Sequence, residues 1–81
     1  MDLQPPPWHK TRIGQPTRAE ATYKNTAINM ATGYDIKEDG YLLHLWVKGV
    51  KADYPLTPFP DEDAALRAGY SHAVEIIDSI S

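Results

Sequence analysis

The chain has no cysteine, which excludes disulfide bonds, thiolate zinc sites and thiol nucleophiles. A protein without cysteine is typical of a reducing compartment, so we expect a cytoplasmic location. The sequence also lacks a continuous apolar run of about 18 residues, the length that a membrane-spanning helix needs. Its first residues, MDLQPPPWHK, do not have the basic-then-apolar order of a signal peptide. These absences predict a soluble protein that contacts no membrane.

The motifs that usually carry catalysis or metal binding are also missing. His9, His44 and His72 do not have the close spacing of metal ligands, and no glycine-rich phosphate loop is present. The acidic run 61–63 has a simpler explanation, because negative charge stabilises the first turn of a helix. We therefore expect a protein that is not an enzyme and that holds neither a metal nor a cofactor.

Charge is mild overall, with a formal net charge of −3, but it is unevenly distributed along the chain. Basic residues outnumber acidic ones up to Met30, and acidic residues predominate from Ala31 onward. Because nucleic-acid affinity depends mainly on lysine and arginine at the phosphates, the acidic part disfavours extensive nucleic-acid binding. A smaller nucleic-acid contact would use the basic residues of the first part, namely Lys10, Arg12, Arg18 and Lys24.

One domain is what this length allows. With 81 residues, of which 42% are hydrophobic, the chain can build a single modest core. Residues 1–16 hold four of the seven prolines, which fix φ and lack an amide donor. We therefore expect residues 1–16 to form a proline-rich extended arm and residues 17–81 to form one α+β domain. Trp8 is large and apolar enough to dock from this arm on its own domain or on a partner.

The segment 17–31 fits two structures. Thr17 and Glu20 have the spacing of a helix capping box, and apolar residues follow at near-helical steps, which slightly favours a helix. The frequent threonine and asparagine residues of this segment compete with the helical backbone for hydrogen bonds and favour a strand instead. The sequence leaves both alternatives open.

The centre of the chain predicts a β-hairpin followed by a third strand. Tyr34 and Ile36 alternate with polar residues, Asp39-Gly40 fits a tight turn, and residues 41–47 are rich in aromatic and branched side chains. In that strand Leu43, Leu45 and Val47 point to one face, and Leu42, His44 and Trp46 to the other. A second turn at Lys48-Gly49 leads to a strand with inward-facing Val50, Ala52, Tyr54 and Leu56, which Pro55 places at a sheet edge.

The last part of the chain predicts a long amphipathic helix. Asp61 fits the N-cap position, and Glu62 and Asp63 place negative charge in the first turn. The apolar residues recur at three- and four-residue steps and form one stripe: Leu66, Tyr70, Ala73, Val74, Ile77 and Ile80. We expect an α+β fold in which a three-stranded antiparallel sheet packs against this C-terminal helix, and the N-terminal segment adds a further helix or strand.

Two stretches, GYDIKEDGYLLHLWVKG and PFPDEDAALRAGYSHAVEIIDS, carry a resemblance that spans roughly residues 33–79. They resemble small bacterial and phage proteins of unknown function that have a β-hairpin, strand and helix, with the pattern F-x-[SD]-x-[ED]-x-A followed by A-x-x-x-I-D. The resemblance implies a fold and no activity. If the segment 17–31 were helical, the element order would also be that of double-stranded-RNA-binding domains. The last helix, however, begins with acidic residues where that family has lysines.

These observations favour a non-catalytic protein-binding module, such as an accessory or inhibitor protein of a phage or mobile element that acts on a host complex. The candidate contact residues are Trp8 and the outer face of the hairpin, represented by Tyr41, Leu42 and Trp46. That outer face is either covered by the N-terminal segment or left as an exposed apolar surface. The alternative function is nucleic-acid binding by the basic N-terminal segment. A homodimer formed through a sheet edge is compatible with both functions.

Overall fold

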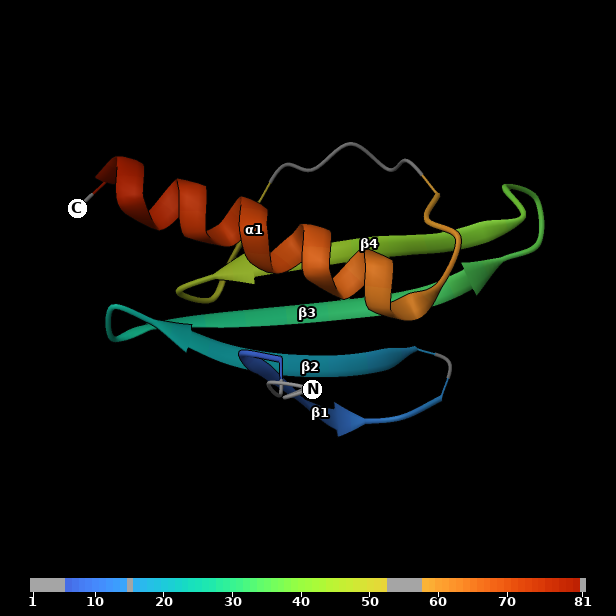
Figure 1. Ribbon diagram of the computed structural model, residues 1–81, viewed down its shortest axis with the longest axis horizontal. Helices are drawn as coiled ribbons and strands as arrows, with labels where there is room; N and C mark the ends of the chain where they lie inside the picture. Colours follow the sequence, from blue (N-terminus) through green and yellow to red (C-terminus); the bar gives the residue numbers. More distant parts are fainter. Residues whose placement is uncertain (1–5, 15, 53–57, 81) are drawn as a thin grey trace, which may run out of the picture.

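The computed structural model describes residues 6–14, 16–52 and 58–80, which form a five-stranded antiparallel sheet with one helix across it (Figure 1). The strands follow one another in space in the order in which they occur in the chain. The fold class is therefore α+β with a C-terminal helix, as predicted, but the sheet has five strands and not three. The elements are β1 (Trp8–Arg12), β2 (Thr17–Tyr23), β3 (Thr26–Asp35), β4 (Gly40–Val47), β5 (Val50–Lys51) and α1 (Glu62–Ile80).

The segment 17–31 forms strand β2 and most of β3, so the helical alternative is wrong and the strand alternative is confirmed. The turn between the two strands consists of Lys24 and Asn25, whose φ angles are 49° and 61°. Positive φ at both positions gives the turn that matches the right-handed twist of paired strands. Strand pairing thus overrides the capping-box signal of Thr17 and Glu20, and the element order of double-stranded-RNA-binding domains is not present.

The predicted turn at Lys48-Gly49 is confirmed, and it has the same form. Both residues have positive φ, 55° and 79°, and Val47 pairs with Val50 across the turn. Strand β5 is short and comprises only Val50 and Lys51 in the described part of the chain. The predicted continuation through Tyr54, Pro55 and Leu56 lies outside the described residues.

The predicted hairpin around Asp39-Gly40 is confirmed as β3–β4, but the two turn residues have different roles from those expected. Asp39 adopts the left-handed conformation, with φ of 51°, and Gly40 is the first residue of β4. A Cβ atom on Gly40 would lie 2.6 Å from Pro58 Cβ and 3.0 Å from the Phe59 carbonyl oxygen. Gly40 is therefore required for close approach of the segment that leads to α1 rather than for its φ.

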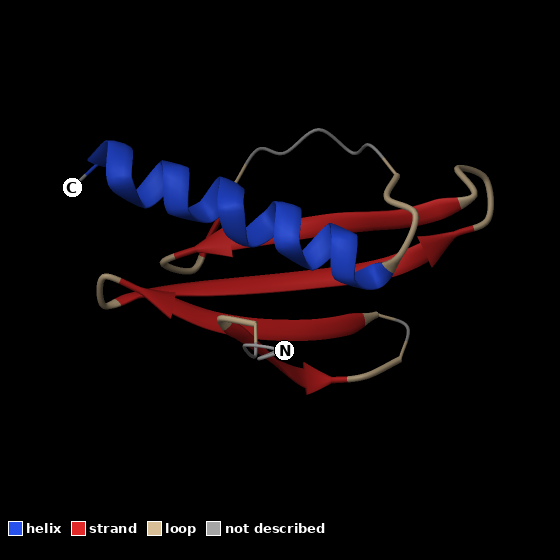
Figure 2. Cartoon of the chain, in the orientation of Figure 1, coloured by secondary structure: helices blue, strands red, loops and turns tan. Residues whose placement is uncertain are grey.

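Helix α1 lies across one face of the sheet, which we call the helix face, and contacts β2, β3 and β4 (Figure 2). Asp61 caps the helix, because its Oδ1 accepts a hydrogen bond of 2.7 Å from the amide of Ala64. The predicted stripe is largely confirmed, but Ile80 is 65% exposed, and Ala65 and Gly69 also belong to the buried side. The absence of a side chain at Gly69 lets the helix approach the sheet closely, since a Cβ there would lie 2.9 Å from Leu43 Cδ2.

The hydrophobic core lies between α1 and the helix face. Side chains at alternate positions of the strands point into it, as the two-residue period of a strand requires. Because the fully buried side chains of β2 are small, the core is filled mainly from β3, β4 and the helix, and Tyr23 at the end of β2 packs against its margin. Its buried members include Trp8, Ala19, Ala21, Ile28, Met30, Leu43, Leu45, Val47, Leu66, Ala73 and Ile77. The helix itself is not long and apolar enough to cross a membrane.

Candidate functional site: the open face of the sheet

Trp8 belongs to the core and not to an exposed contact surface. Residues 8–12 are extended, as expected for this part of the chain, but they pair with β2 as strand β1. The Trp8 side chain is only 8% exposed, and its ring centroid lies 5.8 Å from that of Tyr70 on α1. Of the two predicted alternatives for Trp8, docking on its own domain is the one that occurs.

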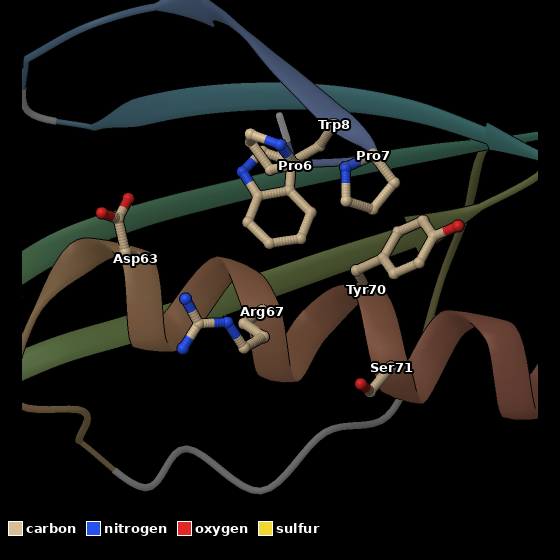
Figure 3. Close-up of a pocket in the computed structure, with 7 residues that line it drawn as sticks. All are labelled: Pro6, Pro7, Trp8, Asp63, Arg67, Tyr70 and Ser71. Atoms are coloured by element: carbon tan, nitrogen blue, oxygen red, sulfur yellow. The ribbon is translucent and has the colours of Figure 1, made fainter. Parts of the chain in front are cut away.

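A shallow hollow adjoins Trp8 where the N-terminal segment passes α1. In Figure 3 the rings of Pro7 and Trp8 face Tyr70 and Arg67, and Asp63 stands at one end. The hollow is lined by Pro6, Pro7, Trp8, Asp63, Arg67, Tyr70 and Ser71. Its two charged side chains have opposite signs, and no described cluster of three or more acidic or histidine side chains lies in it.

Tyr41 lies on the helix face and does not share a surface with Trp46. It is partly buried against the core, and its ring packs edge-on against Tyr34, with centroids 5.6 Å apart. Its backbone also pairs with that of Phe59. Side chains alternate along a strand, so residues 41 and 46, one odd and one even, point to opposite faces. The prediction that Tyr41 shares one surface with Leu42 and Trp46 is therefore wrong.

The face opposite α1, which we call the open face, carries a row of large side chains along β4. Leu42, His44 and Trp46 project from this face and are each half-buried, as the alternation of the strand predicts. The rings of His44 and Trp46 lie 6.3 Å apart and are tilted by 35°. We call these three residues the β4 ridge.

Small side chains line the neighbouring strand on the same face. Gly33, Ala31 and Asn29 of β3 pair in register with Leu42, His44 and Trp46, respectively. Ala31 is only 4% exposed, because the larger side chains beside it shield it from solvent. We call Asn29, Ala31 and Gly33 the β3 groove. The ridge lines a hollow on the open face together with Ala31 and Gly33 of the groove and with Pro16, Arg18, Tyr34 and Asp35.

The residues of the β3 groove were missed as functional candidates by sequence reasoning. The signal was present in the two-residue alternation of Thr26, Ile28, Met30 and Thr32 with small residues. The alternation is not apparent if the segment is read as a helix. In the strand, the even-numbered residues face the core and the odd-numbered residues face the open side.

The basic residues of the first part of the chain do not form one site. Lys10 Nζ lies 2.8 Å from Glu62 Oε2 and 3.6 Å from Asp63 Oδ1, so Lys10 belongs to the helix face. Its hydrogen bond raises the pKa of Lys10 above the usual 10.5 and lowers the pKa of Glu62 below the usual 4.5. An anionic ligand would have to compete with these two carboxylates for Lys10.

Lys24 is paired in the same way at the other end of the helix. Its Nζ donates a hydrogen bond of 2.8 Å to Asp78 Oδ1, and the Tyr23 hydroxyl lies 3.2 Å from both oxygens of that carboxylate. The hydrogen bond from Lys24 lowers the pKa of Asp78 below its usual 3.8. Of the four predicted basic residues, only Arg12 and Arg18 are cross-strand neighbours, at the β1 side of the open face.

Comparison of the chain with protein-family models, with curated proteins and with solved structures finds no match. The geometry of the open face therefore stands alone as the basis for a functional conclusion.

Proposed function

We propose that the chain is a non-catalytic protein-binding module and that the open face of its sheet is the binding surface. The observation that carries this proposal is the β4 ridge, where Leu42, His44 and Trp46 stay half-buried on a face that α1 does not cover. Contiguous apolar and aromatic side chains on a surface are typical of protein contact sites, in which tryptophan frequently dominates the binding energy.

The neighbours of the ridge support a protein partner over a polyanion. The open face mixes both signs of charge, with Arg18 and Lys51 opposed by Glu20 and Asp35. A polar and charged rim around an apolar centre is the usual arrangement of a protein–protein interface. The alternative proposal, nucleic-acid binding by Lys10, Arg12, Arg18 and Lys24, has less support because Lys10 and Lys24 are already paired with carboxylates.

Site-specific photo-crosslinking tests the proposal. A photoreactive phenylalanine analogue is placed at position 42 in the ridge or, as the matched control, at position 75 on the exposed side of α1. After irradiation in cells of the source organism, adducts are separated by size and identified by mass spectrometry. We expect a discrete protein adduct from position 42 that is absent when Trp46→Ala is combined with the probe.

Equal labelling from positions 42 and 75, or no protein adduct from position 42, would contradict the proposal. A nucleic-acid adduct from position 42 would support the alternative instead. The narrower prediction, that the partner is a host complex and the chain an accessory or inhibitor protein of a phage or mobile element, stays a prediction.

A further inference from the structure

We infer that the open face binds a second copy of the same chain and forms a symmetric dimer with the two sheets face to face. This inference rests on the proposed function, because it names the partner of the same surface. Two properties of the open face carry it: a shape that is complementary to itself, and charges that are complementary across the same symmetry axis.

The shape argument follows from the strand register. The ridge residues on β4 stand directly beside the groove residues on β3, as the pairs Leu42–Gly33, His44–Ala31 and Trp46–Asn29. Consider a two-fold axis that runs parallel to the strands, halfway between the two facing sheets and above the line midway between β3 and β4. This axis places the ridge of each copy over the groove of the other copy. Large side chains then meet small ones where Leu42 and His44 lie over Gly33 and Ala31, and the contact uses the same patch on both subunits. Sheets that pack face to face keep their strands roughly aligned, which this axis requires.

The charge argument uses the strands on either side. Four residues form one row across the sheet, from β2 through β3 and β4 to β5. In register, they are Glu20, Asn29, Trp46 and Lys51. Glu20 and Lys51 therefore lie at one level of the sheet, at equal distances on opposite sides of the proposed axis. The axis brings Glu20 of one copy opposite Lys51 of the partner subunit, and this happens twice in each dimer.

Within one chain the same two side chains are too far apart to meet. Three strand spacings separate β2 from β5, which at about 4.8 Å each amounts to roughly 14 Å. Any energetic coupling between Glu20 and Lys51 therefore has to act across two copies of the chain. This separation makes the pair a specific reporter of the proposed dimer.

The edges of the sheet favour this mode over the edge-to-edge homodimer. Strand β1 carries an exposed arginine, Arg12, and its register is interrupted between Lys10 and Arg12. Positive charge and irregular pairing are features that protect an edge strand from a second copy. At the other edge β5 has two residues in the described part of the chain, which gives little backbone to pair.

Sedimentation velocity over a concentration series, from about 10 µM to about 1 mM to include weak interfaces, measures the dimer. We expect reversible dimerisation of the unmodified chain. Glu20→Lys and Lys51→Glu each place like charges opposite one another at two places, and each should raise the dimer Kd about tenfold. The double variant restores two opposite-charge pairs, and its Kd should return to within about twofold of the original.

Glu75→Lys is the matched control, because it makes the same change of charge as Glu20→Lys on the exposed side of α1. Its Kd should stay within about twofold of the unmodified value, whereas Trp46→Ala should abolish dimerisation over the measured range. Circular dichroism of each variant confirms that the fold is retained.

A chain that stays monomeric at every concentration would overturn the inference, as would single and double charge variants with the same Kd. Photo-crosslinking from position 42 separates the two proposals. An adduct between two copies supports the dimer. An adduct with a different protein from a monomeric chain overturns the dimer and leaves the proposed function standing, and no protein adduct overturns both.

Discussion

The two faces of the sheet use the same strands for different purposes. On β4, Leu43 is 1% exposed beneath α1, whereas the neighbouring Leu42 is half-buried on the open face. On β3, the helix face carries Ile28 and Met30 and the open face carries alanine, asparagine and glycine. On the helix face, both β3 and β4 thus carry large side chains. On the open face, only β4 carries them, and β3 carries small ones. The difference indicates that the first face holds the fold together and that the second is not covered by the helix.

Truncation of the two adjacent leucines gives the largest contrast. Leu43→Ala should lower the free energy of unfolding by about 3 kcal/mol, since it removes buried methyl groups and leaves a cavity under α1. Leu42→Ala should lower it by less than about 1 kcal/mol, because that side chain is already in contact with water. Urea denaturation of both variants checks the prediction, and equal losses would remove the distinction between the faces.

Added volume at the helix–sheet contact comes next in size. A Cβ atom at position 69 would lie 2.9 Å from Leu43 Cδ2 and 3.0 Å from the sulfur of Met30. Gly69→Val places a branched side chain there and should cost about 2 kcal/mol. Ser71→Val, on the exposed side of the same helix, should change stability by about 0.5 kcal/mol or less. Thermal unfolding followed by circular dichroism compares the stability of the two variants. An unchanged stability in Gly69→Val would show that the helix does not contact the sheet closely at this position.

Replacement of a buried hydroxyl should stabilise the helix face. Thr32 is 1% exposed, and its Oγ1 has no hydrogen-bond partner among the described residues. Thr32→Val removes this unsatisfied group while keeping the side-chain shape, so we expect a gain of about 1 kcal/mol. Thr22→Val, on the exposed side of β2, is the control and should be close to neutral. A destabilised Thr32→Val would mean that the hydroxyl has a partner after all.

The ion pair between β1 and α1 should have the smallest effect. Lys10→Met removes the contact with Glu62 and should cost about 0.5 kcal/mol at neutral pH, because the pair is partly exposed. Since Lys10 lowers the pKa of Glu62, the stabilisation is complete above the usual carboxyl pKa of 4.5 and is lost as the pH falls through the lower folded value. Thermal unfolding from pH 7 to pH 2 should therefore show a smaller acid loss in Lys10→Met, and identical pH profiles would contradict this.

Helix α1 could be predicted from the sequence because its signals are local. The cap at Asp61, the acidic first turn and the apolar stripe all lie within the element itself. Strands β2 and β3 were harder to predict, because the turn at Lys24 and Asn25 contains no glycine and many of the alternating residues are alanines, which suit a helix equally well. Pairing with β4, which is a tertiary effect, decides between the two structures.

The candidate site was predicted in part. The alternation of β4 was enough to place Leu42 and Trp46 on one face, and the structure agrees. Tyr41 was assigned to the same surface against that alternation. No local signal indicates that Trp8 pairs beside β2 and packs against Tyr70, since a contact between distant parts of the chain depends on the assembled sheet.

The order of the strands also has a consequence for protein synthesis. Because each strand pairs only with its neighbours in the chain, the sheet can assemble progressively as the chain leaves the ribosome. Residues 62–80 emerge after all five strands, and until they do the side chains of Ile28, Met30, Leu43 and Leu45 have no helix to cover them. A nascent chain that stalls before Glu62 would therefore expose two apolar faces instead of one, which makes it a substrate for chaperones and prone to aggregate.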